Sequence, residues 1–399
     1  MMFLQIICIV FLLPAALVCL YYVSLAFCAL ISRRENASIE GNPTHTFAIV
    51  IPAHNEEQGI STTLRSCAGL DYPKDKYKIF VIADNCSDRT AEITRNNGAA
   101  CLERHDEEKK GKGFALEWGF KRILPEGYDT LVVLDADCQL DDNALRIFDY
   151  HLRKGEKVLQ ANDAASNPDN NAMSYTVAVG NLIENRLFYA PKSRLGLAVF
   201  LRGTGMVFRR EVLEQHPWQA HSVVEDAEYT LRLIKSGIKI RFISEVNVFS
   251  EFPDQKDQLE VQRIRWAKNL GFSKMQALRL IWEGIIQGRG LLTDAGWTLL
   301  VLSRPLVLLE LFMAVILGLF CVWLLPGPLS RGLFATGLIL LFVQYFYFGL
   351  GVALLGLNSR RIVLLLSSPA TIGRLILISL LEVFGVRGNM WARTPRKKG

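Results

Sequence analysis

The chain has 399 residues, half of them hydrophobic, and a formal net charge of +6. This length allows one globular domain of roughly 200 to 250 residues plus membrane segments, and the hydropathy excludes a simple soluble protein. The positive charge is small and dispersed, without an aromatic-interleaved basic stripe, so a nucleic-acid-binding protein is not expected and anionic lipid headgroups are the simplest partner.

The first stretch, from Met2 to Ile31, is almost wholly apolar, and no charge appears until Arg33 and Arg34. It is long enough to span a bilayer. A cleaved signal peptide is the alternative, but the preceding positive charge and a small-residue cleavage site are missing. We therefore expect a transmembrane anchor, with the basic pair and the following domain on the cytoplasmic side.

Polar character begins at Glu35 and continues to about Gly290. Short apolar runs alternate there with helical patterns, which is typical of an α/β domain with a largely parallel sheet. Pro52 is expected to end the first strand, because proline cannot donate to the ladder. Three of the runs predict strands: Phe47 to Ile51, Ile79 to Ala83 and Leu131 to Leu134.

Polar residues follow the first two predicted strands. His54, Asn55 and Glu56 are expected to open a helix, whose free backbone amides and polar side chains can receive a nucleobase and ribose. A plain helix cap explains them as well. After the second strand, Asp84 is placed to accept a hydrogen bond from the base or ribose, and Asp88 is either a cap or a ligand.

Asp135 and Asp137 follow the third predicted strand, at the end where open α/β sheets place their ligands. Alternate residues of an extended segment point the same way, so both carboxylates can converge on one hard divalent cation, and such a cation bridges to diphosphate oxygens. A solvated turn is the alternative. Upstream, Lys112 stands between Gly111 and Gly113, where it can follow a diphosphate or form a basic turn.

Two further segments carry candidate residues for a second substrate. Gly203, Thr204 and Gly205 lie between apolar segments, where paired glycines let a substrate approach the backbone, although a β-bulge explains them equally. Glu225 and Asp226 stand at the start of a predicted helix. Carboxylates there are either caps or functional groups.

Gln262, Arg265 and Trp266 lie at i, i+3 and i+4 of a helical pattern and therefore share one face. An aromatic ring suits the apolar face of a sugar, and arginine suits phosphate. A surface helix with a core tryptophan is the alternative. The next helical pattern predicts an amphipathic helix at the membrane interface, with core packing as the alternative, from the spacing of Leu278, Ile281, Trp282 and Ile285.

Apolar character returns after Gly290, and Glu310 lies within the first of these segments. Such an acid marks a buried polar contact or a glycan path, or it reaches headgroups near a helix end. With the amino terminus outside, three carboxyl-terminal crossings after the anchor leave the basic tail Arg393–Lys398 outside, against the positive-inside tendency, so either the last segment is interfacial or re-entrant or the rule fails here. The candidate segments are Pro305 to Leu325, Leu333 to Leu357 and, interrupted by Pro369 and Arg374, Ile362 to Val386.

The order of these motifs resembles the membrane-integrated family-2 glycosyltransferases, which include cellulose, chitin, hyaluronan and poly-N-acetylglucosamine synthases and ceramide glucosyltransferases. The resemblance covers about residues 45 to 270 and the tail WARTPR, at Trp391 to Arg396. It implies a GT-A (Rossmann-like) α/β domain inserted between amino- and carboxyl-terminal transmembrane helices, and a UDP-sugar donor. The GTGM segment differs from the Phe-Phe-Cys-Gly-Ser type of the cellulose synthase-like enzymes, which argues against a long processive pore.

The resemblance also implies a role for each candidate residue. Asp226 is the catalytic base, and Asp135 and Asp137 hold Mg²⁺ or Mn²⁺. The nucleotide-sugar is held by Ala53, His54, Asn55, Glu56, Asp84, Lys112, Asp135 and, in a Q-(Q/R)-x-R-W motif, Gln262, Arg263 and Arg265. The acceptor is bound by Gly203, Thr204, Gly205, Glu225 and Trp266.

The expected function is inverting transfer of a hexose or N-acetylhexosamine from a UDP-sugar to a growing or lipid-linked glycan in exopolysaccharide or envelope synthesis. The alternatives are a single-sugar glycolipid synthase and a non-catalytic scaffold. Expected partners are the bilayer and other polysaccharide-synthesis or export proteins, at the plasma (inner) membrane with a cytoplasmic catalytic domain. The expected parts are an anchor (1–34), a GT-A domain (45–275), an interfacial helix (276–290) and a transmembrane region with a basic tail (298–399).

Overall fold

The structure, a computed structural model, describes residues 2–31, 41–261, 274–301 and 304–383. Its centre is a mixed sheet of the strand order β3-β2-β1-β4-β7-β6-β8-β5. The strands are β1 (Phe47–Ala53), β2 (Tyr77–Asp84), β3 (Ala100–Arg104), β4 (Thr130–Val133), β5 (Gln139–Leu140), β6 (Val158–Ala165), β7 (Met206–Arg209) and β8 (Arg241–Ser250).

All three predicted strands are present as β1, β2 and β4, and β1 pairs in parallel with both of the others. The expectation of a largely parallel sheet holds only for part of it. β7 runs antiparallel to β4 and β6, and β5 runs antiparallel to β8. A short apolar run reveals where a strand lies but carries no information on its direction, which explains the difference.

The end of β1 corrects two expectations. Pro52 does not end the strand, because it pairs with Ile82 of β2. The pairing with β4 stops two residues earlier, at Val50, so the missing proline N–H removes no bond from that side of the ladder. The following residues do not open a helix, since Asn55 has a left-handed φ of 55° and the helix begins only at Ile60.

Two apolar layers cover the faces of the sheet, and alternate residues of β1 enter each of them. One layer is closed by helices such as α2 (Ile60–Ala68) and α5 (Ala144–Arg153). The other continues from the sheet into α1 (Met2–Ile31), whose Tyr22 packs in the same cluster as Phe188 and Tyr347. The sheet domain and the long apolar helices therefore share one core.

The remaining elements flank the sheet or lie between it and the long apolar helices. They are α3 (Thr90–Asn96), α4 (Lys112–Ile123), α6 (Ala172–Ile183), the π-helix η3 (Glu184–Tyr189), α7 (Ala190–Arg194), α8 (Arg210–Gln215), α9 (Glu225–Lys235), α11 (Lys274–Ile286) and α12 (Gly290–Leu300), with short 3₁₀ turns η1 (Lys74–Lys76) and η2 (Leu124–Glu126).

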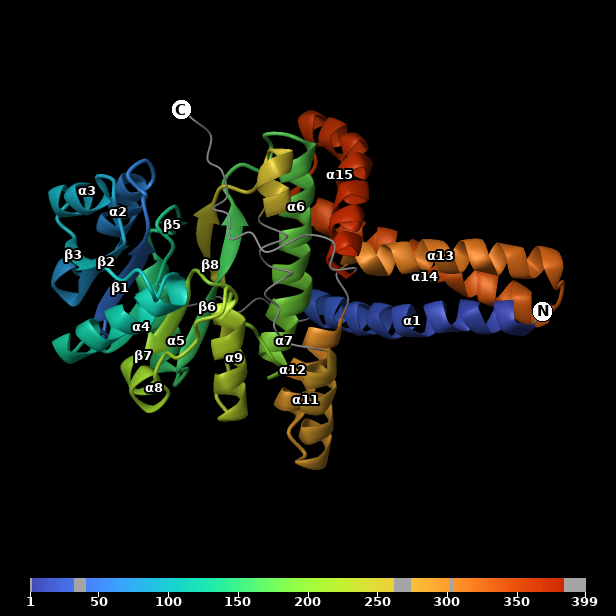
Figure 1. Cartoon of the computed structure of the whole chain (residues 1–399), viewed down its shortest axis with the longest axis horizontal. Helices are drawn as coiled ribbons and strands as arrows, with labels where there is room; N and C mark the ends of the chain where they lie inside the picture. The colour runs from blue at the N-terminus through green and yellow to red at the C-terminus, as the bar shows by residue number, and fades with distance from the viewer. Residues whose placement is uncertain (1, 32–40, 262–273, 302–303, 384–399) are drawn as a thin grey trace.

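Four described helices are long and apolar enough to cross a membrane: α1, α13 (Arg304–Leu324), α14 (Pro328–Leu355) and α15 (Ser359–Val383). Figure 1 shows that α1, α13 and α14 form a bundle that projects away from the sheet. In contrast, α15 lies beside α6 and runs across the end of this bundle. Composition alone does not distinguish these two orientations.

A buried ion pair ties the anchor to the globular part. Lys192 Nζ lies 3.0 Å from Asp294 Oδ2, and the hydroxyl of Tyr21 donates to Asp294 Oδ1 at 2.6 Å. Burial lowers the pKa of Lys192 to about 8, although the Asp294 carboxylate opposes this shift. Elements from three distant parts of the chain, α1, α7 and α12, therefore meet at one charged contact.

Candidate active site

The carboxyl ends of β1 and β2 hold the predicted nucleotide-binding residues side by side. The His54 ring Nδ1 lies 2.7 Å from the Asp84 carbonyl oxygen, and Asn55 Oδ1 accepts from Ser87 N–H at 2.8 Å. Glu56 N–H donates to the Thr90 hydroxyl at 2.7 Å. These contacts fix the loop after β1 against the loop after β2. The sequence did not indicate that the side chains of His54 and Asn55 hold the second loop.

Asp84 is held by a residue that the sequence did not point to. Its Oδ1 accepts from Arg104 Nη1 at 2.5 Å, and both residues are at least 94% buried. Burial raises the pKa of Asp84, while the guanidinium of Arg104 acts in the opposite direction. Arg104 is the last residue of β3. A cationic residue at the end of a strand would have pointed to this position, but that strand was not predicted.

Asp88 caps the neighbouring helix. Its Oδ1 accepts from the backbone N–H of Thr90, the first residue of α3, at 3.0 Å. Its Oδ2 accepts from Glu57 N–H at 3.0 Å. The capping alternative therefore describes this carboxylate, and it helps to join the first two loops.

Lys112 lies at the centre of an acidic group. It is the first residue of α4. Its Nζ is 2.5 Å from Asp135 Oδ1, 2.8 Å from the carbonyl oxygen of Gly203 and 3.8 Å from Glu225 Oε1. Burial alone would lower the pKa of Lys112, but the carboxylates of Asp135 and Glu225 outweigh it and raise that pKa.

The neighbouring Gly113 explains how this lysine reaches the group. A Cβ at Gly113 would lie 2.1 Å from the carbonyl oxygen of Ala220, so only glycine allows the helix to approach so closely. The close approach places the first turn of α4 against the segment that leads to α9.

The Gly203–Gly205 loop lies directly against the end of β4. The backbone N–H of Asp135 donates to the Thr204 hydroxyl at 3.1 Å. Gly205 has a φ of +64°, and a Cβ there would lie within 3 Å of both Val248 and Ala161. This glycine is therefore required by conformation and by packing, and the loop is fixed beside the predicted metal-binding carboxylates.

Glu225 and Asp226 begin α9, as predicted, near Lys112; Glu225 is buried and Asp226 is partly buried. Burial raises the pKa of Glu225 to about 7, with Lys112 opposing the shift and Asp226 adding to it. Burial also raises the pKa of Asp226 above its ordinary value. Asp226 Oδ1 accepts from Ala227 N–H at 2.7 Å, and Oδ2 lies 3.5 Å from where a Cβ on Gly203 would be.

The donor set at Asp135 and Asp137 fits a hard divalent cation. Among the described residues, no group of three or more His, Cys, Asp or Glu side chains is placed to hold a metal ion. Magnesium needs only one or two protein carboxylates when substrate phosphates and waters complete its shell. Asp137 is exposed, and Asp135 already accepts from a cationic side chain, so this end of the strand can hold positive charge.

Four predicted residues, Gln262, Arg263, Arg265 and Trp266, lie outside the described residues, as does the tail at Trp391 to Arg396. The structure brings the others into two adjoining groups. One is the loop pair after β1 and β2. The other joins Lys112, Asp135, Gly203, Thr204, Glu225 and Asp226.

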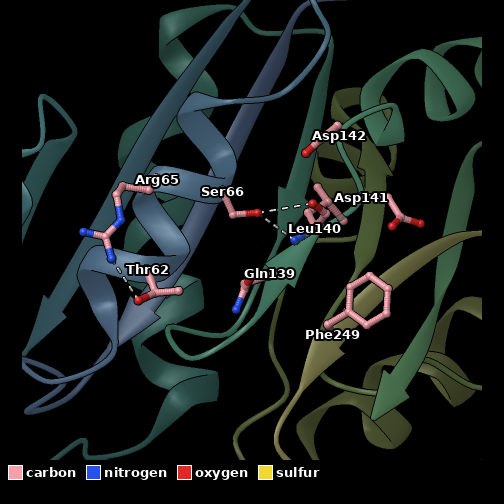
Figure 2. A pocket seen from close by; sticks show the side chains of 8 residues that line it. All are labelled: Thr62, Arg65, Ser66, Gln139, Leu140, Asp141, Asp142 and Phe249. Atoms are coloured by element: carbon pink, nitrogen blue, oxygen red, sulfur yellow. Dashed lines mark hydrogen bonds between the residues drawn. The ribbon is translucent and has the colours of Figure 1, made fainter. Parts of the chain in front are cut away.

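A separate cavity of about 480 Å³ lies beside β5 (Figure 2). It is lined by Thr62, Arg65, Ser66, Gln139, Leu140, Asp141, Asp142 and Phe249. The Ser66 hydroxyl donates to the Leu140 carbonyl at 3.2 Å and accepts from Leu140 N–H at 3.0 Å, which joins α2 to β5. None of the predicted site residues lines this cavity.

Several known proteins are similar to this chain. A probable glycosyltransferase, YdaM, of Bacillus subtilis is 28% identical over 59% of this chain and 60% of its own length. A beta-monoglucosyldiacylglycerol synthase of Trichormus variabilis is 28% identical over 67% of this chain and 58% of its own. The matched region therefore spans less than two thirds of these relatives.

The fold also matches a solved structure, the mannosyltransferase PcManGT of Pyrobaculum calidifontis in complex with GDP-Man and Mn²⁺. The TM-score is 0.59 and the identity 18%, over 96% of this chain and all of the other. Residues 43–269 match the model of the family described as glycosyltransferase like family 2. The chain has a GT-A fold with flanking apolar helices, and it belongs to glycosyltransferase family 2.

Proposed function

We propose that the protein transfers a hexose or N-acetylhexosamine from a UDP-sugar to a hydroxyl group of a membrane-held acceptor, with inversion at the anomeric carbon. The observation that carries this proposal is the convergence of Lys112, Asp135, Glu225 and Asp226 at the end of β4. One cation and three carboxylates there can serve a leaving diphosphate and an attacking hydroxyl at the same time.

The chemistry is a single displacement. The acceptor oxygen forms a bond to the anomeric carbon while the bond from that carbon to the diphosphate oxygen breaks. The hydroxyl proton passes to the carboxylate of Asp226, and UDP leaves with the bonding electron pair. Asp226 suits this role because its raised pKa makes it a stronger base than an ordinary aspartate and because its Oδ2 faces Gly203.

Lys112 stabilises the leaving group in this scheme. Its ammonium group is held at the end of β4, and the raised pKa keeps it charged throughout the neutral range. Asp135 and Asp137 would hold Mg²⁺ or Mn²⁺, which when bound neutralises charge that develops on the diphosphate. The Mn²⁺ in the similar mannosyltransferase structure is consistent with a divalent cofactor.

For the donor, Ala53, His54, Asn55 and Glu56 would contact the nucleoside, and Asp84 would shape its pocket. Ala53 and Asp84 end β1 and β2, which are neighbours in the sheet. Because Asp84 is paired with Arg104, we propose that it contacts the nucleoside with its second carboxylate oxygen. Gln262, Arg263, Arg265 and Trp266 keep the roles that the family resemblance implies.

We further propose three crossings, by α1, α13 and α14, with α15 lying in the membrane interface. The inner side of α15 is polar: the Thr176 hydroxyl donates to Ser368 Oγ at 2.9 Å, and Arg361 makes two bonds to Asp169 at 2.7 and 2.9 Å. Its outer side is apolar and exposed. A one-sided pattern of this kind is typical of a helix that lies on a bilayer.

Figure 1 supports the same placement, since α15 and α11 both run across the bundle axis. The apolar side chains of α11 that the sequence singled out include Leu278, Trp282 and Ile285, and all three are exposed. With the amino terminus outside, three crossings place the catalytic domain and the tail Arg393–Lys398 on the cytoplasmic side. The domain limits 1–34, 45–275, 276–290 and 298–399 remain part of this proposal.

A second candidate is repeated transfer to a growing polysaccharide, which uses the same site. A non-catalytic scaffold does not need a buried base beside a lysine–aspartate pair, and we do not favour it.

The deciding experiment uses the purified full chain in nanodiscs with a panel of UDP-sugars and GDP-mannose, with or without MgCl₂ or MnCl₂. We expect metal-dependent release of UDP from one UDP-sugar and a single glycolipid product. A ladder of oligosaccharides would favour polymerisation, and nucleotide release only from GDP-mannose would contradict the donor class.

A further inference from the structure

Two buried polar side chains hold the Gly203–Gly205 loop, and the proposed mechanism assigns neither of them a role. One is Gln160 of β6 and the other is Thr230 of α9, and both are 0% exposed. Burying a polar group is costly unless it is hydrogen-bonded, so the contacts of these two residues show which part of the fold requires them.

Gln160 holds the residues on both sides of Gly203. Its Oε1 accepts from Arg202 N–H at 2.9 Å, and its Nε2 donates to the carbonyl oxygens of Thr204 at 2.8 Å and Ala161 at 2.9 Å. The side-chain oxygen meets a backbone donor and the side-chain nitrogen meets backbone acceptors, so the partners fix the orientation of the amide. One side chain thus fixes the backbone before and after this glycine.

Thr230 joins the same stretch of backbone to α9. Its hydroxyl accepts from Leu201 N–H at 2.9 Å and donates to the carbonyl oxygen of Asp226 at 2.8 Å. A threonine hydroxyl often donates to the carbonyl four residues earlier in a helix, but here the same oxygen also accepts from the loop. Thr230 therefore connects the first turn of α9, which carries Asp226, to the backbone that leads into Gly203.

Gly203 borders both of the charged groups that the proposed reaction needs. Its carbonyl oxygen accepts from Lys112 Nζ at 2.8 Å. Its φ is +80°, and a Cβ there would lie 3.4 Å from Lys112 Nζ and 3.5 Å from Asp226 Oδ2. The ammonium and the carboxylate thus both face the bare α-carbon of Gly203, and the position of the loop determines how they lie relative to each other.

The rest of the loop is bound to the sheet. Ala161 N–H donates to the Gly205 carbonyl oxygen at 2.8 Å, and the Thr204 hydroxyl accepts from Asp135 N–H at 3.1 Å. The loop therefore contacts α4, the end of β4 and α9, which are the three elements that carry the charged groups of the candidate site.

We propose that Gln160 and Thr230 are positioning residues that set, through the Gly203–Gly205 loop, the separation between the Lys112 ammonium and the Asp226 carboxylate. This inference rests on the proposed transferase function, in which the ammonium serves the leaving diphosphate and the carboxylate takes the acceptor proton. A small displacement of either group is costly to the rate. Opposite charges attract, so a released loop would let the ammonium pair with the carboxylate and make it a weaker base.

The first test is Thr230→Val, which keeps the shape of the side chain but leaves Leu201 N–H without its acceptor. We expect kcat, counted per UDP-binding site so that unfolded protein does not contribute, to fall about tenfold while the donor KM stays within about twofold. Thr230→Ser retains the hydroxyl and should recover most of kcat. An unchanged kcat in Thr230→Val, or a loss that Thr230→Ser does not recover, would overturn the proposal.

Thr94→Val is the matched control. Thr94 is also 0% exposed, and its hydroxyl also donates to the carbonyl oxygen four residues earlier, that of Thr90, at 2.8 Å. Its helix, α3, packs against α2, β2 and β3. We expect the wild-type kcat in this variant. An equal loss of kcat in Thr94→Val and Thr230→Val would reveal a general effect of removing a buried hydroxyl and would contradict the positioning role.

Gln160→Met tests whether the two residues act on the same loop. Methionine has a similar volume but makes none of the hydrogen bonds of the amide, so kcat should again fall about tenfold, with the donor KM little changed. Because either loss already releases the loop, the double variant with Thr230→Val should lose about 10- to 30-fold. A loss of about 100-fold, the product of the two single effects, would mean that the residues act independently, against the proposal.

All variants are measured as the full chain in nanodiscs, with the nucleotide-sugar and acceptor lipid on which the wild-type protein is most active. Wild-type turnover together with an unchanged kcat in both single variants would overturn the positioning role and leave the transferase function intact. If the wild-type protein released no nucleotide from any UDP-sugar or from GDP-mannose, the transferase function itself would be rejected, and this inference with it.

Discussion

Two regions beside the sheet are built differently. At the catalytic edge, where β1, β2 and β4 end, side chains are fixed by bonds of 2.5 to 3.1 Å, as between Lys112 and Asp135 or Asp84 and Arg104. Between the sheet and α13, Glu184 makes longer ion pairs, with oxygens 3.8 Å from Arg202 Nη1 and 3.6 Å from Arg304 Nη2. In the proposed function, the first region is preorganised for the charge that develops during transfer. The second joins the sheet to α13 through longer ion pairs.

We expect the largest effect from a substitution of Asp226. We expect Asp226→Asn to lower kcat by about 10² to 10⁴, because the hydroxyl proton then has no carboxylate to receive it. The binding of UDP, measured by isothermal titration, should change little. Full activity in this variant would place the base elsewhere, and a loss confined to the acceptor KM would assign Asp226 to the acceptor side.

Removing the cation of the catalytic edge should have the next largest effect. Lys112→Met leaves Asp135 and Glu225 without their ammonium partner and should reduce kcat by about 10²-fold through weaker stabilisation of the departing diphosphate. Single-turnover kinetics with a saturating UDP-sugar measure this step. Lys121→Met is the control, because that lysine pairs with Glu117 on an exposed face. Equal rates in the two variants would contradict the assignment.

The contribution of the buried ion pair of Asp84 and Arg104 can be measured as a change in the free energy of unfolding. Arg104→Gln leaves the Asp84 carboxylate buried without its ion pair, and we expect the free energy of unfolding to fall by about 3–5 kcal/mol. Arg95→Gln removes an exposed ion pair with Glu103 and should cost at most about 1 kcal/mol. Denaturant unfolding of both variants provides the comparison. Similar losses would show that burial of the Asp84 pair has no special weight.

The smallest effect is a shift in pH dependence. Because burial raises the pKa of Glu225 to about 7 and also raises that of Asp226, the pair takes up a proton as the pH falls through about 7. The base must be deprotonated, so kcat should fall on the acid side of this value. Glu225→Gln removes the group that titrates near 7, and the acid limb of kcat should move to lower pH. An unmoved limb would mean that another group titrates there.

The sequence placed Asp84 and Asp135 at strand ends and Lys112 beside two glycines, and the structure brings Lys112 and Asp135 together. Asp135 comes directly after an apolar run, and Lys112 begins a helix beside two glycines, so short segments were sufficient to place them. Arg104 was missed because β3 carries no clear apolar run. The ion pair of Arg304 and Glu184 could not be predicted, since these residues are brought together only when α13 packs beside α6 and η3.

The same limit applies to α15. Its composition satisfies a spanning helix, and only its contacts with α6 and with Asp169, just before α6, reveal a polar inner side, so orientation depends on what the helix packs against. The start of the helix after β1 was placed too early, at His54 to Glu56, because of a backbone conformation that the sequence does not reveal. Asn55 adopts a left-handed conformation that a local pattern of polar residues does not indicate.

The contact between Tyr21 and Asp294 has a consequence for biosynthesis. These residues are separated by 273 positions, so α1 leaves the ribosome long before the carboxylate that its tyrosine will bind. Until Asp294 is synthesised, both Tyr21 and the buried Lys192 lack this partner, and the core around them cannot close. Placement of α1 is therefore an early step in maturation of the protein. A fragment expressed without α1 would leave the charged pair of Lys192 and Asp294 uncovered in its core.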